Sequence, residues 1–345
     1  MTGTAGATRS GRRRRGGLDG CWMILCGLAL TGAAWGQTKV AGSNESAAQL
    51  VIIDTDIGDD IDDAFALGLA LQSRELKVLG IMTAWGNTPL RARLVGRFLE
   101  EAGRQEIPIA VGIEKYPARG KLTFSQERYA ERGQEKKLPE AVDFLLEEIR
   151  KHPGEITVIA IGPETNLGAT IERDAETFRK LKRVVLMGGS VYRGYEGFEH
   201  PTVIPHAQPE WNILCDIPAA RRVFASGVPL YVMPLDSTQI RLQDLERTRI
   251  FSNGTGLTDA LALLYYQWAA SVKQPTPTLF DAVAVAYAIK PELCPTTPLR
   301  LRVDDEGNTK VETGEPNAQV CLRSDSDRFF EFYMPRILGG NGARE

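Results

Sequence analysis

Six aspartates lie within ten positions between Asp54 and Asp63, which makes this segment the part of the sequence best suited to chemistry. A short apolar run precedes the segment and an apolar helical pattern follows it. Carboxylates this close repel one another, and a bound divalent cation removes that repulsion. Capping of a helix N-terminus accounts for only one or two of the six. Because oxygen ligands favour Ca²⁺ or Mg²⁺ over zinc, the segment predicts a site for one of these cations.

The elements that must position these aspartates alternate between residue 50 and about residue 250. The alternation predicts an α/β fold with an open, mostly parallel sheet and helices on both faces, in which ligands bind where the strands end. Strands are predicted at 50–53, 78–83, 107–111, 156–161, 183–187 and 229–233, and helices at 62–71, 90–102, 139–151 and 218–225. Segment 193–209 has little periodicity and is predicted to be a long loop.

The pattern changes after about residue 250. We expect helices at 257–271, 280–289 and 328–337 and a further strand at 318–323. A small C-terminal β-hairpin is predicted over 299–311, turning through 304–308. Together with the preceding elements, these segments predict one catalytic domain over residues 50–340.

The first 36 residues have the pattern of a secretory signal peptide, and residues 37–49 are predicted to be a linker. Residues 12–15 are basic, residues 21–34 are apolar, and Ala34 and Gly36 form a small-x-small cleavage pattern. Because about fourteen apolar residues are short for a membrane span, we expect an exported protein, periplasmic or secreted, with no membrane association after signal removal. The formal net charge of −3 disfavours nucleic acid as a partner.

Three cysteines follow the predicted signal peptide: Cys215, Cys294 and Cys321. An odd number without close spacing is not the pattern of a disulfide framework, and the sequence shows no Cys/His metal motif. We therefore expect buried thiols, of which one pair could be bonded.

The acidic segment resembles the signature of the nucleoside hydrolases of the inosine–uridine-preferring type, Asp-x-Asp-Pro-Gly-x-Asp-Asp-Ala. The matching residues are Asp54, Asp56, Gly58, Asp62, Asp63 and Ala64. Ile57 replaces the proline of the signature, and two residues within 59–61 are extra. The extra residues leave open whether Asp60 or Asp62 takes the sugar-binding role.

Four further regions match family segments in the family's order. They are Gly86-Asn87; residues 159–167, which contain Gly-Pro-Glu-Thr-Asn where the family has Gly-Pro-Leu-Thr-Asn; residues 209–220, which contain Glu210 and Asn212 of a Glu-x-Asn segment; and residues 280–284, with Asp281. Residues 185–189 also resemble a strand and turn of the family. Each match is weak alone, but their common order makes the resemblance specific.

The resemblance implies that water cleaves the N-glycosidic bond of ribonucleosides with the help of Ca²⁺. It implies Asp56, Asp63, Asp281 and the backbone carbonyl of Ile161 as metal ligands, with Asp56 also as general base. The implied contacts to ribose hydroxyls are Asp62, Asn87, Glu210 and Asn212, and Asp54 and Asp60 are implied as supporting residues. A homo-oligomer, dimer or tetramer, is also implied.

Aromatic residues and histidines are the candidates for contact with the leaving base. Some family members place a histidine before the late aspartate, where it protonates the base, but this chain has Phe280. We expect Phe280 to stack on the base, aided by Trp268, although both are equally well explained as core aromatics. His200 and His206 are alternative acids, and Ile204 stands where the family commonly has a ribose-binding asparagine.

Two other functions are compatible with parts of the pattern. An Asp-x-Asp pair after a strand also begins the haloacid-dehalogenase phosphatases, but Gly58 departs from their motif and the later segments are then unexplained. A non-catalytic exported protein that captures ribosides or sugars on the same fold is the second alternative. Release of sugar from nucleosides, measured with and without a chelator, separates the hydrolase from the binding protein.

Overall fold

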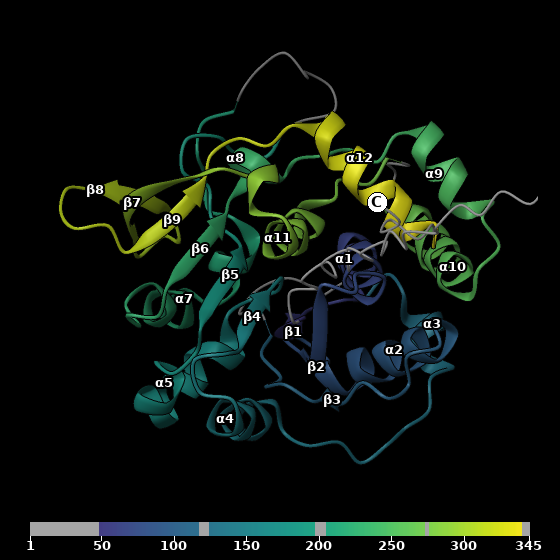
Figure 1. Cartoon of the computed structure of the whole chain (residues 1–345), viewed down its shortest axis with the longest axis horizontal. Helices are drawn as coiled ribbons and strands as arrows, with labels where there is room; N and C mark the ends of the chain where they lie inside the picture. Colours follow the sequence, from purple (N-terminus) through teal and green to yellow (C-terminus); the bar gives the residue numbers. More distant parts are fainter. Residues whose placement is uncertain (1–47, 117–123, 197–204, 273–275, 340–345) are drawn as a thin grey trace, which may run out of the picture. The chain divides into compact units, whose positions relative to one another are not determined.

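The computed structural model describes residues 48–116, 124–196, 205–272 and 276–339. Nine strands in these residues form one sheet in the order β3-β2-β1-β4-β5-β6-β9-β7-β8 (Figure 1). The strands are β1 (Gln49–Thr55), β2 (Leu76–Thr83), β3 (Ile109–Ala110), β4 (Thr157–Ala160), β5 (Arg183–Met187), β6 (Leu230–Met233), β7 (Thr296–Val303), β8 (Thr309–Glu312) and β9 (Ala318–Cys321). All neighbours from β3 to β9 pair in parallel, and only β7 and β8 run antiparallel to theirs. The predicted open, mostly parallel sheet is confirmed.

Helices cover both faces of this sheet, as predicted. One face packs against α1 (Asp62–Leu71), α2 (Thr88–Glu101), α10 (Gly256–Ser271), α11 (Phe280–Ile289) and α12 (Ser326–Ile337). The other face packs against α4 (Ala141–Lys151), α5 (Thr165–Phe178) and α7 (Ile217–Phe224). Alternation along β1 explains the two layers, because Val51 and Ile53 face the first group and Ile52 faces the second.

Shorter elements complete the described chain. They are α3 (Glu127–Glu131), α6 (Trp211–Cys215), α8 (Leu235–Thr238), α9 (Asp244–Phe251) and the 3₁₀ helix η1 (Pro291–Leu293). None of the described helices is long and apolar enough to cross a membrane. The predicted signal peptide and most of the predicted linker lie outside the described residues.

The switch in strand order places the acidic segment. From β1 the chain passes to β2 on one side and later returns to β4 on the other side of β1. The helices that follow β1 and β4 pack on opposite faces of the sheet. In sheets of this kind, ligands bind in the crevice at the carboxyl ends of the strands where the order switches, here β1 and β4. Asp54 is in β1 and Asp56 follows it directly.

The C-terminal hairpin forms, but it is not a separate addition. β7 and β8 pair over Arg300–Val303, and the Asp304 carboxylate accepts a hydrogen bond from the Asn308 amide at 2.8 Å in the turn. β9 inserts between β6 and β7, so the hairpin continues the main sheet. The long α5 was not among the predicted helices; it contains Asp174 in a non-helical conformation (φ −155°, ψ 77°), which interrupts its pattern.

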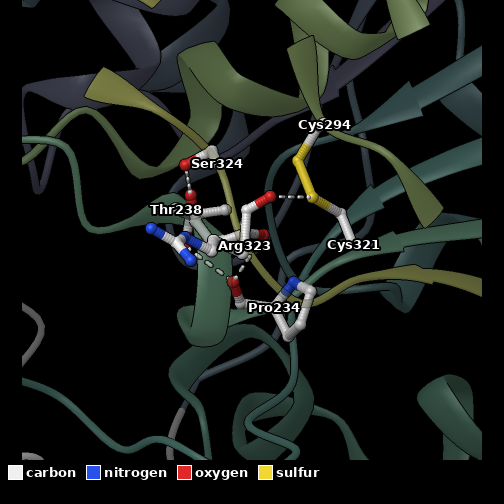
Figure 2. The surroundings of a disulfide bond; sticks show 7 residues. Pro234, Thr238, Cys294, Cys321, Arg323 and Ser324 are labelled. Carbon is white, nitrogen blue, oxygen red and sulfur yellow. Dashed lines mark hydrogen bonds between the residues drawn. A yellow bond between two sulfur atoms is a disulfide. The ribbon is translucent and has the colours of Figure 1, made fainter. Parts of the chain in front are cut away.

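A disulfide links the end of β9 to the segment between η1 and β7 (Figure 2). It joins Cys294, directly after η1, to Cys321, the last residue of β9. The remaining cysteine of the described residues, Cys215, is free and half-buried. The bonded pair that the sequence left open is therefore Cys294–Cys321.

Candidate active site

Three buried aspartates meet where α1 and α11 begin. Asp62 and Asp63 lie in the first turn of α1, and Asp281 lies in the first turn of α11. One carboxylate oxygen from each residue lies within 4.8 Å of those of the other two. The three residues are only 5%, 3% and 3% exposed, so water does little to separate their charges.

This acidic centre, defined as Asp62, Asp63 and Asp281, is costly without a counter-ion. Burial raises the pKa of each carboxyl well above its ordinary value, and repulsion from neighbouring carboxylates raises it further. The hydroxyl of Thr55 donates to Asp63 Oδ1 at 2.5 Å and orients that carboxylate. A set of converging carboxylate oxygens fits a hard divalent cation, which would stabilise the ionised forms.

Asp56 lies next to the acidic centre at the end of β1. Its charge is among those that raise the pKa of Asp63 and Asp281. A Cβ atom on Gly162 would lie 2.8 Å from the Asp56 amide nitrogen and 2.9 Å from Asp56 Oδ1, so only glycine allows the end of β4 to approach this closely. Burial raises the pKa of Asp56 to about 7, against a lowering effect of Arg91. A carboxyl with this pKa is suited to general-base work near neutral pH.

Asp54 lies behind Asp56 and is completely buried. The side-chain amide of Asn166 donates to Asp54 Oδ1 at 2.8 Å, whereas Asp54 Oδ2 has no partner in the described part of the chain. Burial raises the pKa of Asp54 to about 7. This position fits the supporting role that the sequence predicted.

Asp60 and Asp62 differ in their surroundings, although repulsion from Asp60, after burial, helps to raise the pKa of Asp62. Asp62 belongs to the acidic centre. Asp60 is exposed, and its Oδ1 accepts a hydrogen bond from the backbone amide of the next residue, Ile61, at 2.7 Å. The side chain of Trp268 also hydrogen-bonds Asp60. Asp62 is thus the better placed of the two for a ligand held at the acidic centre.

Glu210 and Asn212 lie at the other side of the crevice, beyond β5. The Glu210 carboxylate caps α6 and accepts from the amides of Asn212 at 2.9 Å and Gly189 at 3.0 Å. The Asn212 side chain donates to the Met187 carbonyl at 3.1 Å. Asn87 is exposed and caps α2, where its side chain accepts from the Leu90 amide at 3.0 Å.

The two aromatic residues predicted to contact the base differ in environment. Trp268 is 6% exposed and packs within the α10 core, as the alternative interpretation expected. Phe280 is only partly buried, and its ring meets the ring of Tyr195 edge-on with centroids 6.1 Å apart. The Tyr195 hydroxyl also donates to Glu210 Oε1 at 3.4 Å. Tyr195 therefore connects the Glu210 side of the crevice with the Phe280 side.

One of the two histidines named as alternative acids lies in the described part of the chain. His206 is exposed and its segment forms a β-bridge with Arg193. His200 and Ile204 lie outside the described residues.

Comparison with known proteins identifies the family. The model of the inosine-uridine preferring nucleoside hydrolases matches residues 51–331, which include every residue of the acidic centre. This chain belongs to that family. A pyrimidine-specific ribonucleoside hydrolase RihA of Citrobacter koseri is 33% identical over 319 residues, covering 83% of this chain and 97% of the relative. RihA of Escherichia coli O9:H4 is 32% identical over the same shares.

Solved nucleoside hydrolases share the fold. The plant enzyme PpNRh1 superposes with a TM-score of 0.72 at 26% identity, covering 84% of this chain and 99% of that structure. A purine-preferring ribonucleoside hydrolase from Gardnerella vaginalis gives a TM-score of 0.70 at 25% identity over 85% and 99%. The chain is therefore an enzyme of the N-glycosyl hydrolase type, and membership in this family disfavours both the phosphatase and the non-catalytic alternatives.

Comparison with the nucleoside hydrolase signature did not mark three residues that the structure places at this site. They are Arg91, Glu164 and Tyr195. Arg91 is the buried cation beneath the acidic segment and had no motif to mark it. Glu164 had a signal, because it stands where the family segment has leucine. Tyr195 lay in the predicted loop 193–209, where no periodicity marks a buried contact.

Glu164 is completely buried, and neither of its carboxylate oxygens has a hydrogen-bond partner in the described ranges. A Cβ atom on Gly188 would lie 3.5 Å from Glu164 Oε1 and 3.4 Å from Glu210 Oε2, so the two carboxyls approach the same space. Burial, followed by repulsion from Glu210, raises the pKa of Glu164 well above its ordinary value of 4.5. These surroundings favour the neutral form of the Glu164 carboxyl over its charged form.

Proposed function

We propose that this nucleoside hydrolase is an exported, calcium-dependent enzyme that cleaves ribonucleosides into ribose and free base. The observation that carries the proposal is the convergence of Asp62, Asp63 and Asp281 from the starts of two helices. Three buried carboxylates with oxygen-only chemistry favour Ca²⁺ over a soft metal. Asp56 and the carbonyl of Ile161, at the ends of β1 and β4, would complete the ligand set.

A bound Ca²⁺ would lower the pKa of a coordinated water and grip vicinal ribose hydroxyls. The protein's own part is to take a proton and to stabilise positive charge. Asp56, at the end of β1 and beside the acidic centre, accepts the proton of the attacking water. As the glycosidic bond breaks, the sugar gains oxocarbenium character, and the surrounding carboxylates favour that charge.

The sugar and the base are held by different groups. Asp62 reaches the ribose hydroxyl nearest the cation, and Glu210 and Asn212 line the far side of the crevice. Phe280 stacks on the leaving base, and Tyr195 supports its ring from the edge. Asn87, at the start of α2, offers a further ribose contact from an exposed position.

Two observations support export. The N-terminal segment has the basic, apolar and small-residue order of a signal peptide. The Cys294–Cys321 disulfide suits an oxidising compartment, since cytosolic thiols are kept reduced. A homo-oligomer, dimer or tetramer, is the assembly we expect from the family resemblance, and light scattering on the purified enzyme measures it.

A substrate panel tests the activity. Purified protein is assayed for reducing sugar released from inosine, adenosine, uridine and cytidine, first with Ca²⁺, then after EDTA, then after Ca²⁺ is restored. We expect release from at least one nucleoside, loss with EDTA and recovery with Ca²⁺. The absence of release from any nucleoside by folded, calcium-loaded protein would reject the proposal, and full activity in EDTA would reject its metal.

A further inference from the structure

The two extra residues of the acidic segment lie in a loop that the surrounding protein holds by its backbone. The hydroxyl of Ser125 donates to the Asp59 carbonyl at 2.6 Å. The side-chain amide of Gln126 donates to the Asp60 carbonyl at 2.8 Å, and its backbone amide donates to the Gly58 carbonyl at 3.1 Å. Residues 58–60 are thus fixed from the segment that leads into α3.

Arg91, on α2, binds the same loop through hydrogen bonds and an ion pair. Its side chain is 0% exposed, and its guanidinium donates to the carbonyls of Asp56 and of Ile57, the latter at 2.9 Å. It also pairs with Asp59 Oδ2 at 2.8 Å and donates to the Trp85 carbonyl at 2.7 Å. One rigid guanidinium therefore fixes two consecutive carbonyls directly after β1, those of Asp56 and Ile57, against the Trp85 carbonyl.

Phe124 closes this arrangement. Its ring centroid lies 5.2 Å from the Arg91 guanidinium carbon. A Cβ atom on Gly58 would lie 2.4 Å from the same ring, and Gly58 has φ +129°, so glycine is required there on two grounds. The loop is packed between an aromatic ring and a buried cation.

We propose that Arg91 and the Phe124–Gln126 segment are positioning residues. They hold residues 56–60, here called the acidic loop, in the conformation in which Asp56 binds the cation. The inference rests on the proposed metal site. A loop already in its bound conformation loses less freedom when the cation arrives, so the affinity is higher. The ion pair also engages Asp59, which keeps a nearby carboxylate from competing for the cation.

Arg91→Lys tests the proposal, because lysine keeps the charge but loses the planar fork. Calcium affinity of the metal-free protein is measured by isothermal titration calorimetry, and thermal unfolding of the same preparation reports folding. We expect the Kd for Ca²⁺ to rise about tenfold, the lower range for loss of groups that orient metal ligands. An unchanged Kd, with only a lower unfolding temperature, would overturn the proposal.

The control is Arg97→Lys on the same helix. Arg97 also pairs with a carboxylate, Glu101 at 2.8 Å, and stacks 3.8 Å from the Tyr129 ring centroid, but it does not touch the acidic loop. We expect its Kd for Ca²⁺ to match that of the wild-type protein. An equal rise in Arg97→Lys would show that loosening α2 suffices and would overturn the assignment to Arg91.

Two further variants keep the test decisive. If Arg91→Lys does not fold, Ser125→Ala removes one clamp of the loop at a half-buried site, and a Kd raised about threefold is expected. No change there would overturn the proposal. Asp59→Asn leaves the backbone contacts of Arg91 intact, and a loss as large as in Arg91→Lys would assign the effect to the ion pair alone. Failure of the wild-type protein to bind Ca²⁺ rejects the proposed metal instead.

Discussion

In the β7–β8 hairpin the carboxylates face arginines and water, whereas those at the starts of α1 and α11 face one another in the interior. Asp305 pairs with Arg221 at 2.5 Å, and Glu312 pairs with Arg302. Both pairs are at the surface. In the acidic centre, one oxygen of each aspartate lies within 4.8 Å of the other two.

The difference separates structural from functional use of the same residue type. A paired carboxylate in water contributes little to stability and nothing to reactivity. Buried carboxylates beside one another destabilise the fold and persist where they serve binding or catalysis. Substitutions in or beside the acidic centre should therefore lower the activity. Substitutions in the hairpin should change the stability or have no measurable effect.

The largest effect is expected for Asp56→Ala. Removal of the general base should lower kcat for a nucleoside substrate by about 10³-fold or more, while circular dichroism remains unchanged. Asp305→Ala in the hairpin provides the matched control and should retain full activity. Near-normal turnover by Asp56→Ala would assign the base to another carboxylate.

The next largest effect, on stability, is expected from removal of the Cys294–Cys321 disulfide at the end of β9. The Cys294→Ser/Cys321→Ser double variant opens a loop with a sequence separation of 27, which should lower the free energy of unfolding by about 3 kcal/mol. Urea denaturation measures the loss. Cys215→Ser, at the free half-buried cysteine, should change the midpoint far less. Equal midpoints for the double variant and the wild-type protein would show that the disulfide does not stabilise the sheet.

Glu164→Leu should stabilise the protein, and more so at alkaline pH. The pKa of Glu164 is raised above its ordinary 4.5 in the folded state, so its contribution is fully present below pH 4.5 and is lost as the pH rises towards the folded pKa. Leucine removes this loss. We expect a gain of about 1 kcal/mol or more near pH 8 and a smaller gain near pH 5, from urea denaturation. Exposed Glu172→Leu is the control, and a pH-independent gain would contradict the neutral buried acid.

The smallest effect is expected for Arg302→Ala. The arginine and its partner Glu312 are 53% and 35% exposed, so water and salt screen the pair. The urea midpoint should equal that of the wild-type protein within error. A loss of stability as large as that of the disulfide variant would show that surface ion pairs stabilise the hairpin. The distinction between surface carboxylates and those of the acidic centre would then be wrong.

Much of the architecture could be predicted because the parallel strands are short apolar runs and most of them precede a helical pattern. The helix α5, after β4, could not be predicted, because the non-helical Asp174 interrupts its pattern. Asp62, Asp63 and Asp281 could be named only through the resemblance of the acidic segment and of residues 280–284 to family segments, and the structure brings their carboxylates together. The choice between Asp60 and Asp62 could not be made, because it depends on how the extra residues fold against Trp268 and Ser125. Arg91 was beyond sequence analysis, since a buried arginine on a helix is recognised only by the carbonyls that it meets.

The raised pKa values at the acidic centre also have a consequence for the solution around the enzyme. Carboxyls whose pKa is raised in the metal-free protein would release any protons that they hold when a cation enters, so binding would acidify the medium. The heat of binding would then depend on the ionisation enthalpy of the buffer, and the apparent affinity would fall as the surroundings become acidic. The occupancy of the cation site would then follow the acidity of the surroundings.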